Sequence, residues 1–361
     1  MRDVSPKSGR AAAHETRATA LILLLALMLG GGAAAQSWPE PEWTKADPAS
    51  SGWSAEKLAK AERQAADLRL TAVMIVQHGK VIAAWGDTTA KLKIHSMRKS
   101  LLSALYGIGV SEGSIDLSRT LEDLAIYDSA PALTDTEKTA TIRDLLMARS
   151  GVYHAAVYED PDMKAKRPAR GSHPPGAFWY YNNWDFNALG TIYEQLTKAR
   201  VFNSFEQRIA RVVGMEDYKP SDGRYMREPE SIHPAYAFSM SARDLARFGL
   251  LFLNGGRWKD KQIIPASWVK ESTAAHTASA DLRGGYGYLW WRASESEGRG
   301  LLMGADSYFA LGYGGQMLAV VPSRDLIIVK LVDHIAYPVD ARRAATAELL
   351  RSIMSAAAGP D

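Results

Sequence analysis

The chain has 361 residues, of which 47% are hydrophobic and 23% are charged. This composition supports a large buried core and excludes an intrinsically disordered or collagen-like protein. Residues 1–35 contribute four basic and two acidic side chains to the formal net charge of +3, which leaves 39 basic and 38 acidic residues, a net of +1, in the rest. So small a charge gives no long-range field for polyanions, and we expect no nucleic-acid partner. Zero cysteines exclude disulfides, thiolate metal sites and a catalytic thiol.

Residues 1–35 have the layout of a secretory signal peptide. A stretch with basic residues precedes an apolar run at 18–29, and three glycines and Ala33-Ala34-Ala35 follow it. This order predicts cleavage near Gln36 and a periplasmic or secreted product. The apolar run has about a dozen residues, fewer than the ~20 that span a bilayer, so we expect no membrane partner after cleavage.

The predicted elements begin after a proline-containing lead-in, with a helix at 54–68 that Ser54 is placed to cap. Apolar, β-branched runs on either side of short turns predict two hairpins. A long polar loop at 159–175 exceeds ordinary connections, which indicates a mobile or functional segment. The remaining predicted elements are strands 71–77 and 81–85, a helix from 96 to about 109, helical segments within 122–199, strands 316–321 and 326–332, and a helix at 340–356.

Strands near both ends with helices between them predict one sheet built from the two termini. We therefore expect a mixed α/β fold, an antiparallel sheet flanked by helices, with a mainly helical domain inserted between its halves. The expected boundaries are a signal peptide at 1–35, the N-terminal part of the α/β domain at 36–120, the helical domain at 121–245 and the C-terminal part of the α/β domain at 246–361. The active site is expected in the cleft between the two domains.

One serine motif is Gly109-Val110-Ser111-Glu112-Gly113, which matches the GxSxG elbow of α/β-hydrolases. That motif has mechanical meaning only on a sharp turn from strand to helix. Ser111 follows a predicted helix instead, so we interpret these glycines as a helix end and a turn.

A second pattern, SxxK, occurs three times, from Ser54, Ser96 and Ser267. Its chemistry requires a serine and a lysine one helical turn apart, at a helix start where burial favours the neutral amine. In the helix from 96, an apolar stripe lies roughly opposite Ser96, Lys99 and Ser103, which leaves this pair on a separate face, free to line a cleft. We interpret Ser54 as a cap, and Ser267 as a structural residue without a suitable tyrosine downstream.

The partner expected for such a pair is a tyrosine or serine two residues before an asparagine. Two overlapping candidates occur, Tyr180 with Asn182 and Tyr181 with Asn183. A phenol beside an amine relays protons, and an asparagine amide orients the lysine and the substrate. By itself the aromatic segment is equally consistent with a helix start packed in the core.

Six segments of the chain occur in an order that is specific although each alone is weak. They are Ser96-Met97-Arg98-Lys99, Ile142-Arg143-Asp144-Leu145-Leu146 with Ser150-Gly151, Pro175-Gly176 with Tyr181-Asn182-Asn183, residues 239–249, residues 285–291, and Gly312-Tyr313-Gly314-Gly315-Gln316. In these segments the chain resembles the serine β-lactamase and penicillin-binding protein superfamily. The similar branch is the class C-like one of esterases, D-aminopeptidases and 6-aminohexanoate-dimer-type amide hydrolases, and the resemblance covers roughly residues 53–352.

The resemblance implies a β-lactamase/DD-peptidase-like fold and a set of roles. Ser96 would be the acylated nucleophile, Lys99 and Tyr181 would share general acid and base work, and Asn183 would position the substrate. Counting from Pro175 favours Tyr181 over Tyr180. The backbone N–H groups of Ser96 and Tyr313 would hold the oxyanion, with Gly312 allowing the edge strand to approach closely.

One departure from the resemblance concerns the substrate. Relatives carry a lysine or histidine, a threonine or serine, and a glycine where this chain has Ala310-Leu311-Gly312. The missing cation and hydroxyl would bind a substrate carboxylate, so we expect a neutral ester or amide unless Arg283 or Arg292 compensates. Six aromatic residues are candidates for an apolar acyl pocket, although core packing is the commoner role: Trp179, Trp184, Trp290, Trp291, Tyr308 and Phe309.

The remaining polar residues form no recognisable site. No spacing supports a triad of His154, Asp185 and His334, and we interpret these histidines as structural. His78, His95, His173 and His233 lack metal-ligand spacing, so neither a metal nor another cofactor is expected. The sequence therefore predicts an exported serine hydrolase acting on a small-molecule ester or amide. The alternatives are a penicillin-recognising or peptidoglycan-sensing binding protein, and a weak β-lactamase or D-Ala carboxypeptidase.

Overall fold

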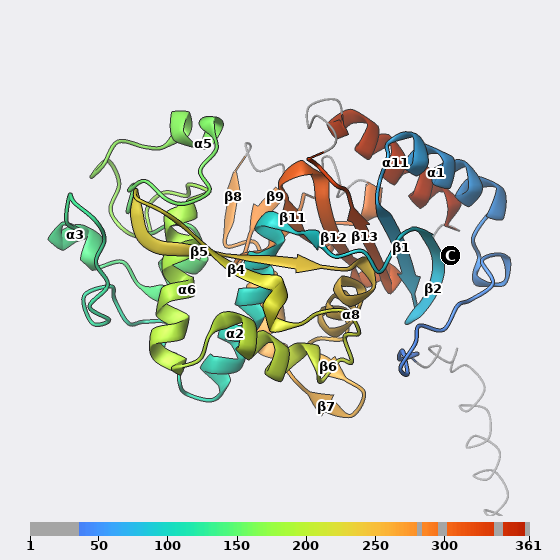
Figure 1. Ribbon diagram of the computed structural model, residues 1–361, viewed down its shortest axis with the longest axis horizontal. Coiled ribbons are helices and arrows are strands. Elements are labelled where there is room, and N and C mark those ends of the chain that lie inside the picture. The colour runs from blue at the N-terminus through green and yellow to red at the C-terminus, as the bar shows by residue number, and fades with distance from the viewer. Residues whose placement is uncertain (1–35, 280–283, 295–301, 336–341, 358–361) are drawn as a thin grey trace, which may run out of the picture. The chain divides into compact units, whose positions relative to one another are not determined.

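An antiparallel sheet of eight strands, drawn from both ends of the described chain, forms the centre of the fold (Figure 1). The computed structural model describes residues 36–279, 284–294, 302–335 and 342–357; the expected signal peptide lies outside them. The strand order is β2-β1-β13-β12-β11-β10-β9-β8. The bounds are β1 (Ala72–Gln77), β2 (Lys80–Gly86), β8 (Thr277–Ser279), β9 (Gly284–Tyr286), β10 (Trp291–Ala293), β11 (Tyr308–Gly312), β12 (Gln316–Val321) and β13 (Leu326–Leu331).

The two faces of this sheet bury two separate hydrophobic cores because strand side chains alternate between the faces. On one face Ile75, Ile328 and Ala319 lie opposite one another in register. They pack with α1 (Ala55–Asp67) and α11 (Arg342–Ala356), which lie together in Figure 1. On the other face, side chains such as Met74 and Leu318 contribute to a larger core that includes α8 (Ala242–Leu253). Both hairpins, the Ser54 cap and the closing helix are confirmed.

The larger core surrounds α2 (Arg98–Ser111), the helix that carries Lys99. This helix packs against α6 (Asn183–Thr197), α7 (Val201–Phe205), α9 (Ala266–Ser272) and β5 (Ser231–Met240). Every residue from Arg98 to Gly109 is buried. Of the predicted separate face, Ser96 lines the cavity described below, whereas Lys99 and Ser103 are buried by neighbouring elements.

The segment between the two halves of the large sheet holds helices and a smaller sheet of order β3-β5-β4. Its further elements are β3 (Leu92–Lys93), α3 (Asp135–Lys138), α4 (Ile142–Leu146), α5 (Pro161–Lys166) and β4 (Gly223–Glu228). The predicted loop at 159–175 thus contains a helix, α5. The domain boundaries at 120 and 245 remain predictions. Residues Ser37–Asp361 group into one compact unit. Among the described residues no helix has the length and apolar character needed to cross a membrane.

Candidate active site

Ser96 lies in a short 3-10 turn, η2 (His95–Met97), directly before α2. The turn is fixed by two buried anchors, Ile94 and Met97, and the Met97 amide donates to the Ile94 carbonyl at 3.2 Å. His95 has a φ of 51°, in the left-handed region that non-glycine residues rarely adopt. The backbone is therefore strained immediately before Ser96, as is common at functional sites.

The side chain of Lys99 joins Ser96 to Tyr181. Its Nζ donates to Ser96 Oγ at 2.9 Å and to Tyr181 OH at 2.6 Å. It also lies 4.2 Å from the centre of the Tyr181 ring and 4.3 Å from that of Phe186. The structure thus brings together the serine, the lysine and the phenol that the sequence suggested.

Burial changes the protonation of this group of side chains. Lys99 is 2% exposed, and its burial, followed by the charge of Arg98, lowers the pKa of its amine well below the ordinary value. Burial also raises the pKa of the Tyr181 phenol to about 12. Both shifts favour a neutral amine beside a neutral phenol, so Lys99 is the group able to accept a proton and Tyr181 the group able to donate one.

The start of α6 sets the position of Tyr181. Asn182 caps this helix by accepting a hydrogen bond from the Trp184 amide at 3.1 Å, and its Nδ2 donates to the Val152 carbonyl at 2.7 Å. Tyr181 immediately precedes the cap and reaches Lys99. Tyr180 points elsewhere and donates its hydroxyl to the Met163 carbonyl at 2.8 Å.

Asn183 lies at the same helix start, but it makes no hydrogen bond to Lys99. Its Nδ2 donates to the Tyr158 carbonyl at 2.6 Å, and its buried Oδ1 has no partner among the described residues. The amide therefore fastens the segment before α5 to α6. The expected orientation of Lys99 by Asn183 is absent from the described contacts, because Lys99 Nζ donates to Ser96 and Tyr181 and not to Asn183 Oδ1.

Gly312 brings the end of β11 against the turn that holds Ser96. A Cβ at this position would overlap the Ile94 carbonyl oxygen and lie 2.9 Å from the Cβ of Gln316. Its φ of −126° is ordinary, so closeness and not backbone conformation requires the glycine here. The carbonyl group that Gly312 approaches so closely is therefore the backbone carbonyl of Ile94. Tyr313 follows Gly312 beside Ser96, half exposed.

The strand that carries Gly312 is not an edge strand of the sheet, contrary to expectation. β11 lies between β12 and β10. However, β10 pairs only with Tyr308 and Phe309, whereas β12 pairs along the whole of β11. Residues 310–312 therefore behave as a local edge within the described sheet.

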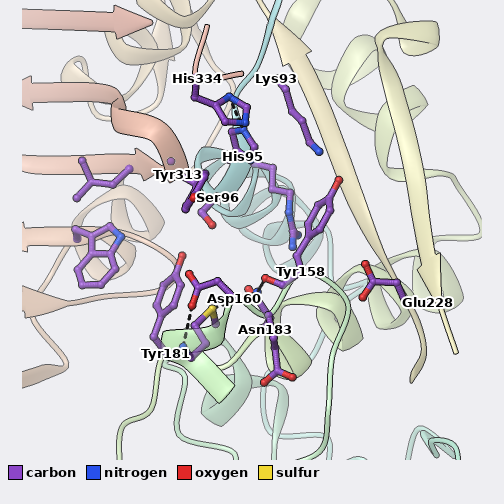
Figure 2. Close-up of a pocket in the computed structure, with 16 residues that line it drawn as sticks. Lys93, His95, Ser96, Tyr158, Asp160, Tyr181, Asn183, Glu228, Tyr313 and His334 are labelled. Carbon is purple, nitrogen blue, oxygen red and sulfur yellow. Dashed lines mark hydrogen bonds between the residues drawn. The ribbon is translucent and has the colours of Figure 1, made fainter. Parts of the chain in front are cut away.

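A cavity of about 570 Å³ opens over Ser96 (Figure 2). In Figure 2, His95, Ser96 and Tyr313 lie together, across the cavity from Glu228. The cavity lining includes residues of η2, β3, β4, the end of β11 and the segment around α5, so the predicted long loop contributes to the cavity wall. The residues that line it are Lys93, His95, Ser96, Arg98, Tyr158, Glu159, Asp160, Met163, Tyr181, Asn183, Glu228, Trp291, Leu311, Gly312, Tyr313 and His334. Lys99 is not among them and lies beneath Ser96.

Two histidines for which no role at the site was predicted, His95 and His334, line this cavity. His95 Nε2 and His334 Nδ1 lie 3.3 Å apart, and the Tyr313 ring packs edge-on against both imidazoles. Burial, followed by His334, lowers the pKa of His95 to about 3, so this imidazole is neutral at physiological pH. For His95, the one feature of the sequence that could have predicted a place at the site is its position next to Ser96. No such feature exists for His334.

Ser111 and the residues His154 and Asp185 of the alternative motifs do not line this cavity. Ser111 ends α2 and is exposed, which confirms a helix end and not an elbow. The would-be triad is dispersed, with Asp185 accepting from Ser150 at 2.5 Å and His154 near Asp128 and Glu137. The described residues contain no group of three or more His, Cys, Asp or Glu side chains that could hold a metal.

Of the six aromatic candidates for a pocket wall, only Trp291 lines the cavity in the described chain. Trp179 packs against the rings of Tyr181 and Trp291. Core packing holds for the fully buried ones: Trp184, Trp290, Tyr308 and Phe309. Arg292 donates to the Asp306 carbonyl at 2.7 Å and lines a different hollow, so it does not replace the missing cation. Arg283 lies outside the described residues.

Comparison with known proteins identifies the family. The family model described as Beta-lactamase matches residues 56–352. The chain belongs to the β-lactamase family. Members of this family are generally serine hydrolases, and the cavity over Ser96 lies within the matched residues. No curated protein sequence matches the chain.

Several solved structures share the fold of this β-lactamase family member. A Bacillus anthracis protein provisionally named a 6-aminohexanoate-dimer hydrolase has a TM-score of 0.65 and 20% identity, over 89% of each chain. A β-lactamase from Mycobacterium bovis has a TM-score of 0.56 and 18% identity, over 81% of this chain and 99% of its own. The octameric penicillin-binding protein homologue from Pyrococcus abyssi has a TM-score of 0.59 and 16% identity, over 82% of this chain and 76% of its own. At these identities the likeness concerns the fold alone.

Proposed function

We propose that the protein is an exported serine hydrolase that cleaves a small ester or amide through an acyl-enzyme on Ser96. The observation that carries the proposal is the position of Lys99 Nζ within hydrogen-bonding distance of both Ser96 Oγ and Tyr181 OH, beneath an open cavity. A nucleophile with an adjacent neutral base is the arrangement that acyl transfer requires. The signal-like layout of residues 1–35 supports export.

In the first step of the proposed reaction, Ser96 Oγ attacks the substrate carbonyl while its proton passes to the Lys99 amine. The proton then moves through the Tyr181 hydroxyl to the departing alcohol or amine, which leaves an ester on Ser96. Water then attacks this ester, the acyl group leaves as a carboxylic acid, and a proton from the water passes through Lys99 and Tyr181 to Ser96 Oγ. Backbone N–H groups of Ser96 and Tyr313 would stabilise the oxyanion, each worth ~3 kcal/mol in the transition state.

The cavity wall supports a substrate without a carboxylate next to the bond that is cleaved. Leu311 and Gly312 line the cavity where relatives would place a hydroxyl and a glycine, and Ala310 is buried. The carboxyl groups of Asp160 and Glu228 line the same cavity and would repel a substrate anion. Two permanently charged cations occur in this lining. Lys93 lies over the Tyr158 ring at 4.6 Å from its centre, and Arg98 lies over the Tyr236 ring and donates to Asn187 Oδ1.

Turnover assays on two substrate classes test this function. We expect hydrolysis of a p-nitrophenyl ester that exceeds hydrolysis of a chromogenic cephalosporin, with both lost in Ser96→Ala. Rapid cephalosporin hydrolysis would contradict a neutral recognition site. Acylation of Ser96 without release of product would instead support a penicillin-recognising or peptidoglycan-sensing protein.

A further inference from the structure

Arg98 is a buried cation without an anionic partner in the described part of the chain. Its side chain is 1% exposed, its Nη2 donates to the neutral Asn187 Oδ1 at 2.8 Å, and its guanidinium lies 4.2 Å from the centre of the Tyr236 ring. Its Nη1 is buried and has no hydrogen-bond partner there. The equally buried Arg247, by contrast, forms an ion pair with Glu216 at 2.9 Å.

An unpaired buried charge is costly, and proteins ordinarily compensate it with a carboxylate. Arg98 precedes Lys99 in the chain, at the start of the same helix. Two positive charges in a dry environment disfavour each other, so the fixed charge of the guanidinium opposes protonation of the amine. Asn187 has a neutral amide at the position where a carboxylate would neutralise the guanidinium. The charge of Arg98 therefore continues to oppose protonation of Lys99.

The other titratable groups around this pair do not cancel the effect. The carboxyl group of Asp160 lines the same cavity and contributes to the raised pKa of Tyr181, but it is not among the causes of the lowered pKa of Lys99. The groups whose pKa responds to Arg98, besides Lys99, are an imidazole in η2 and phenols from the segment before α6, from β5 and from β9: His95, Tyr181, Tyr236 and Tyr286. None of these four side chains carries a negative charge at neutral pH. The carboxyl group of Asp185 on α6 is bound to Ser150 and Asn182, and burial raises its pKa well above the ordinary value.

We propose that Arg98 is a positioning residue of the hydrolase site, whose unpaired buried charge keeps the Lys99 amine in its neutral, proton-accepting form. The inference rests on the proposed acylation of Ser96. Arg98 also contributes to the cavity lining, but the effect proposed here is the one that it exerts through Lys99, whose lowered pKa has burial as its larger cause and Arg98 as its second.

The test measures the rate of Ser96 labelling by a fluorophosphonate between pH 5 and 9. The variants are Arg98→Met, which removes the charge, and Asn187→Asp, which keeps Arg98 and gives it a carboxylate. Asn187→Leu is the matched control, because it loses the hydrogen bonds of Asn187 without adding a charge. Thermal unfolding reports whether each variant is folded.

We expect the acid limb of the labelling rate to move up by about one pH unit in Arg98→Met and in Asn187→Asp, which is a tenfold loss of rate below the limb. Above the limb the rate in Asn187→Asp should equal that of the parent, and Asn187→Leu should keep the parental limb. A parental limb in folded Asn187→Asp would overturn the role of Arg98, even if Arg98→Met does not fold. Absence of labelling at Ser96 in the parent would instead overturn the proposed function.

Discussion

Gly312 lies so close to the Ile94 carbonyl oxygen that a Cβ on the glycine would overlap it. This contact joins the end of β11 to the turn that carries Ser96. We expect Gly312→Ala to push the strand and the Tyr313 amide away from Ser96, and to lower the rate of fluorophosphonate labelling at least tenfold. The crowding should also cost about 1–3 kcal/mol of stability.

The control for this change is Gly113→Ala. Gly113 has a φ of 71°, no neighbouring atom within 4 Å of a Cβ, and no place in the cavity lining. Its alanine variant should lose about 1 kcal/mol to backbone strain while labelling at the parental rate. Equal labelling rates in the two variants would argue against an oxyanion site at Tyr313.

Lys99→Met tests the proton acceptor. Methionine is similar in length and apolar, and it would contact the same Tyr181 and Phe186 rings while lacking a basic nitrogen. We expect labelling of Ser96 to fall at least a hundredfold, in the range that general base catalysis contributes, with an unchanged circular dichroism spectrum. A rate equal to that of the parent would remove Lys99 from the mechanism.

Lys99→Met also tests how the free energy of unfolding depends on pH. Burial lowers the pKa of Lys99 in the folded protein below its ordinary value of 10.5, so between that lowered pKa and pH 10.5 the unfolded chain binds more protons at this residue. The free energy of unfolding of the parent should therefore rise with pH relative to Lys99→Met, by up to about 1.4 kcal/mol per pH unit, until pH 10.5. Urea unfolding at pH 7, 8 and 9 measures the difference; a constant difference would show that the amine is charged in the folded state.

Sequence patterns predicted those parts of the structure that depend on neighbouring residues. The hairpin of β1 and β2 follows from two apolar runs around a short turn, and the Ser54 cap from a serine before an amphipathic helix. Ser96 and Lys99 are one helical turn apart in any helix, so their contact was predictable. Tyr181 was predictable only through the family resemblance, because it lies far from Lys99 in the chain.

The burial of Lys99 and the composition of the cavity could not be predicted in the same way. Helix α2 shows an apolar stripe and a polar one, but α6, α7, α9 and β5 cover both. Four separate segments contribute side chains to one cavity: Lys93, Tyr158, Glu228 and His334. Their meeting depends on tertiary packing, for which no local spacing is a signal.

Leu311→Lys tests the specificity inferred from the cavity wall. Leu311 lines the cavity whereas Ala310 is buried, so a cation at 311 would face the substrate. We expect kcat/KM for an ester that carries a carboxylate to rise about tenfold relative to a neutral ester, as one charge-assisted hydrogen bond provides. Leu311→Met should keep the parental ratio. An unchanged ratio in Leu311→Lys would show that the carboxylate binds elsewhere in the cavity.

The most direct test of the account is mass spectrometry of the protein after reaction with a fluorophosphonate, with peptide mapping of the label. We predict one adduct, on the peptide that contains Ser96, and none in Ser96→Ala. A label on Ser111, or an unmodified Ser96 in the folded protein, would contradict the assignment of Ser96 as the nucleophile.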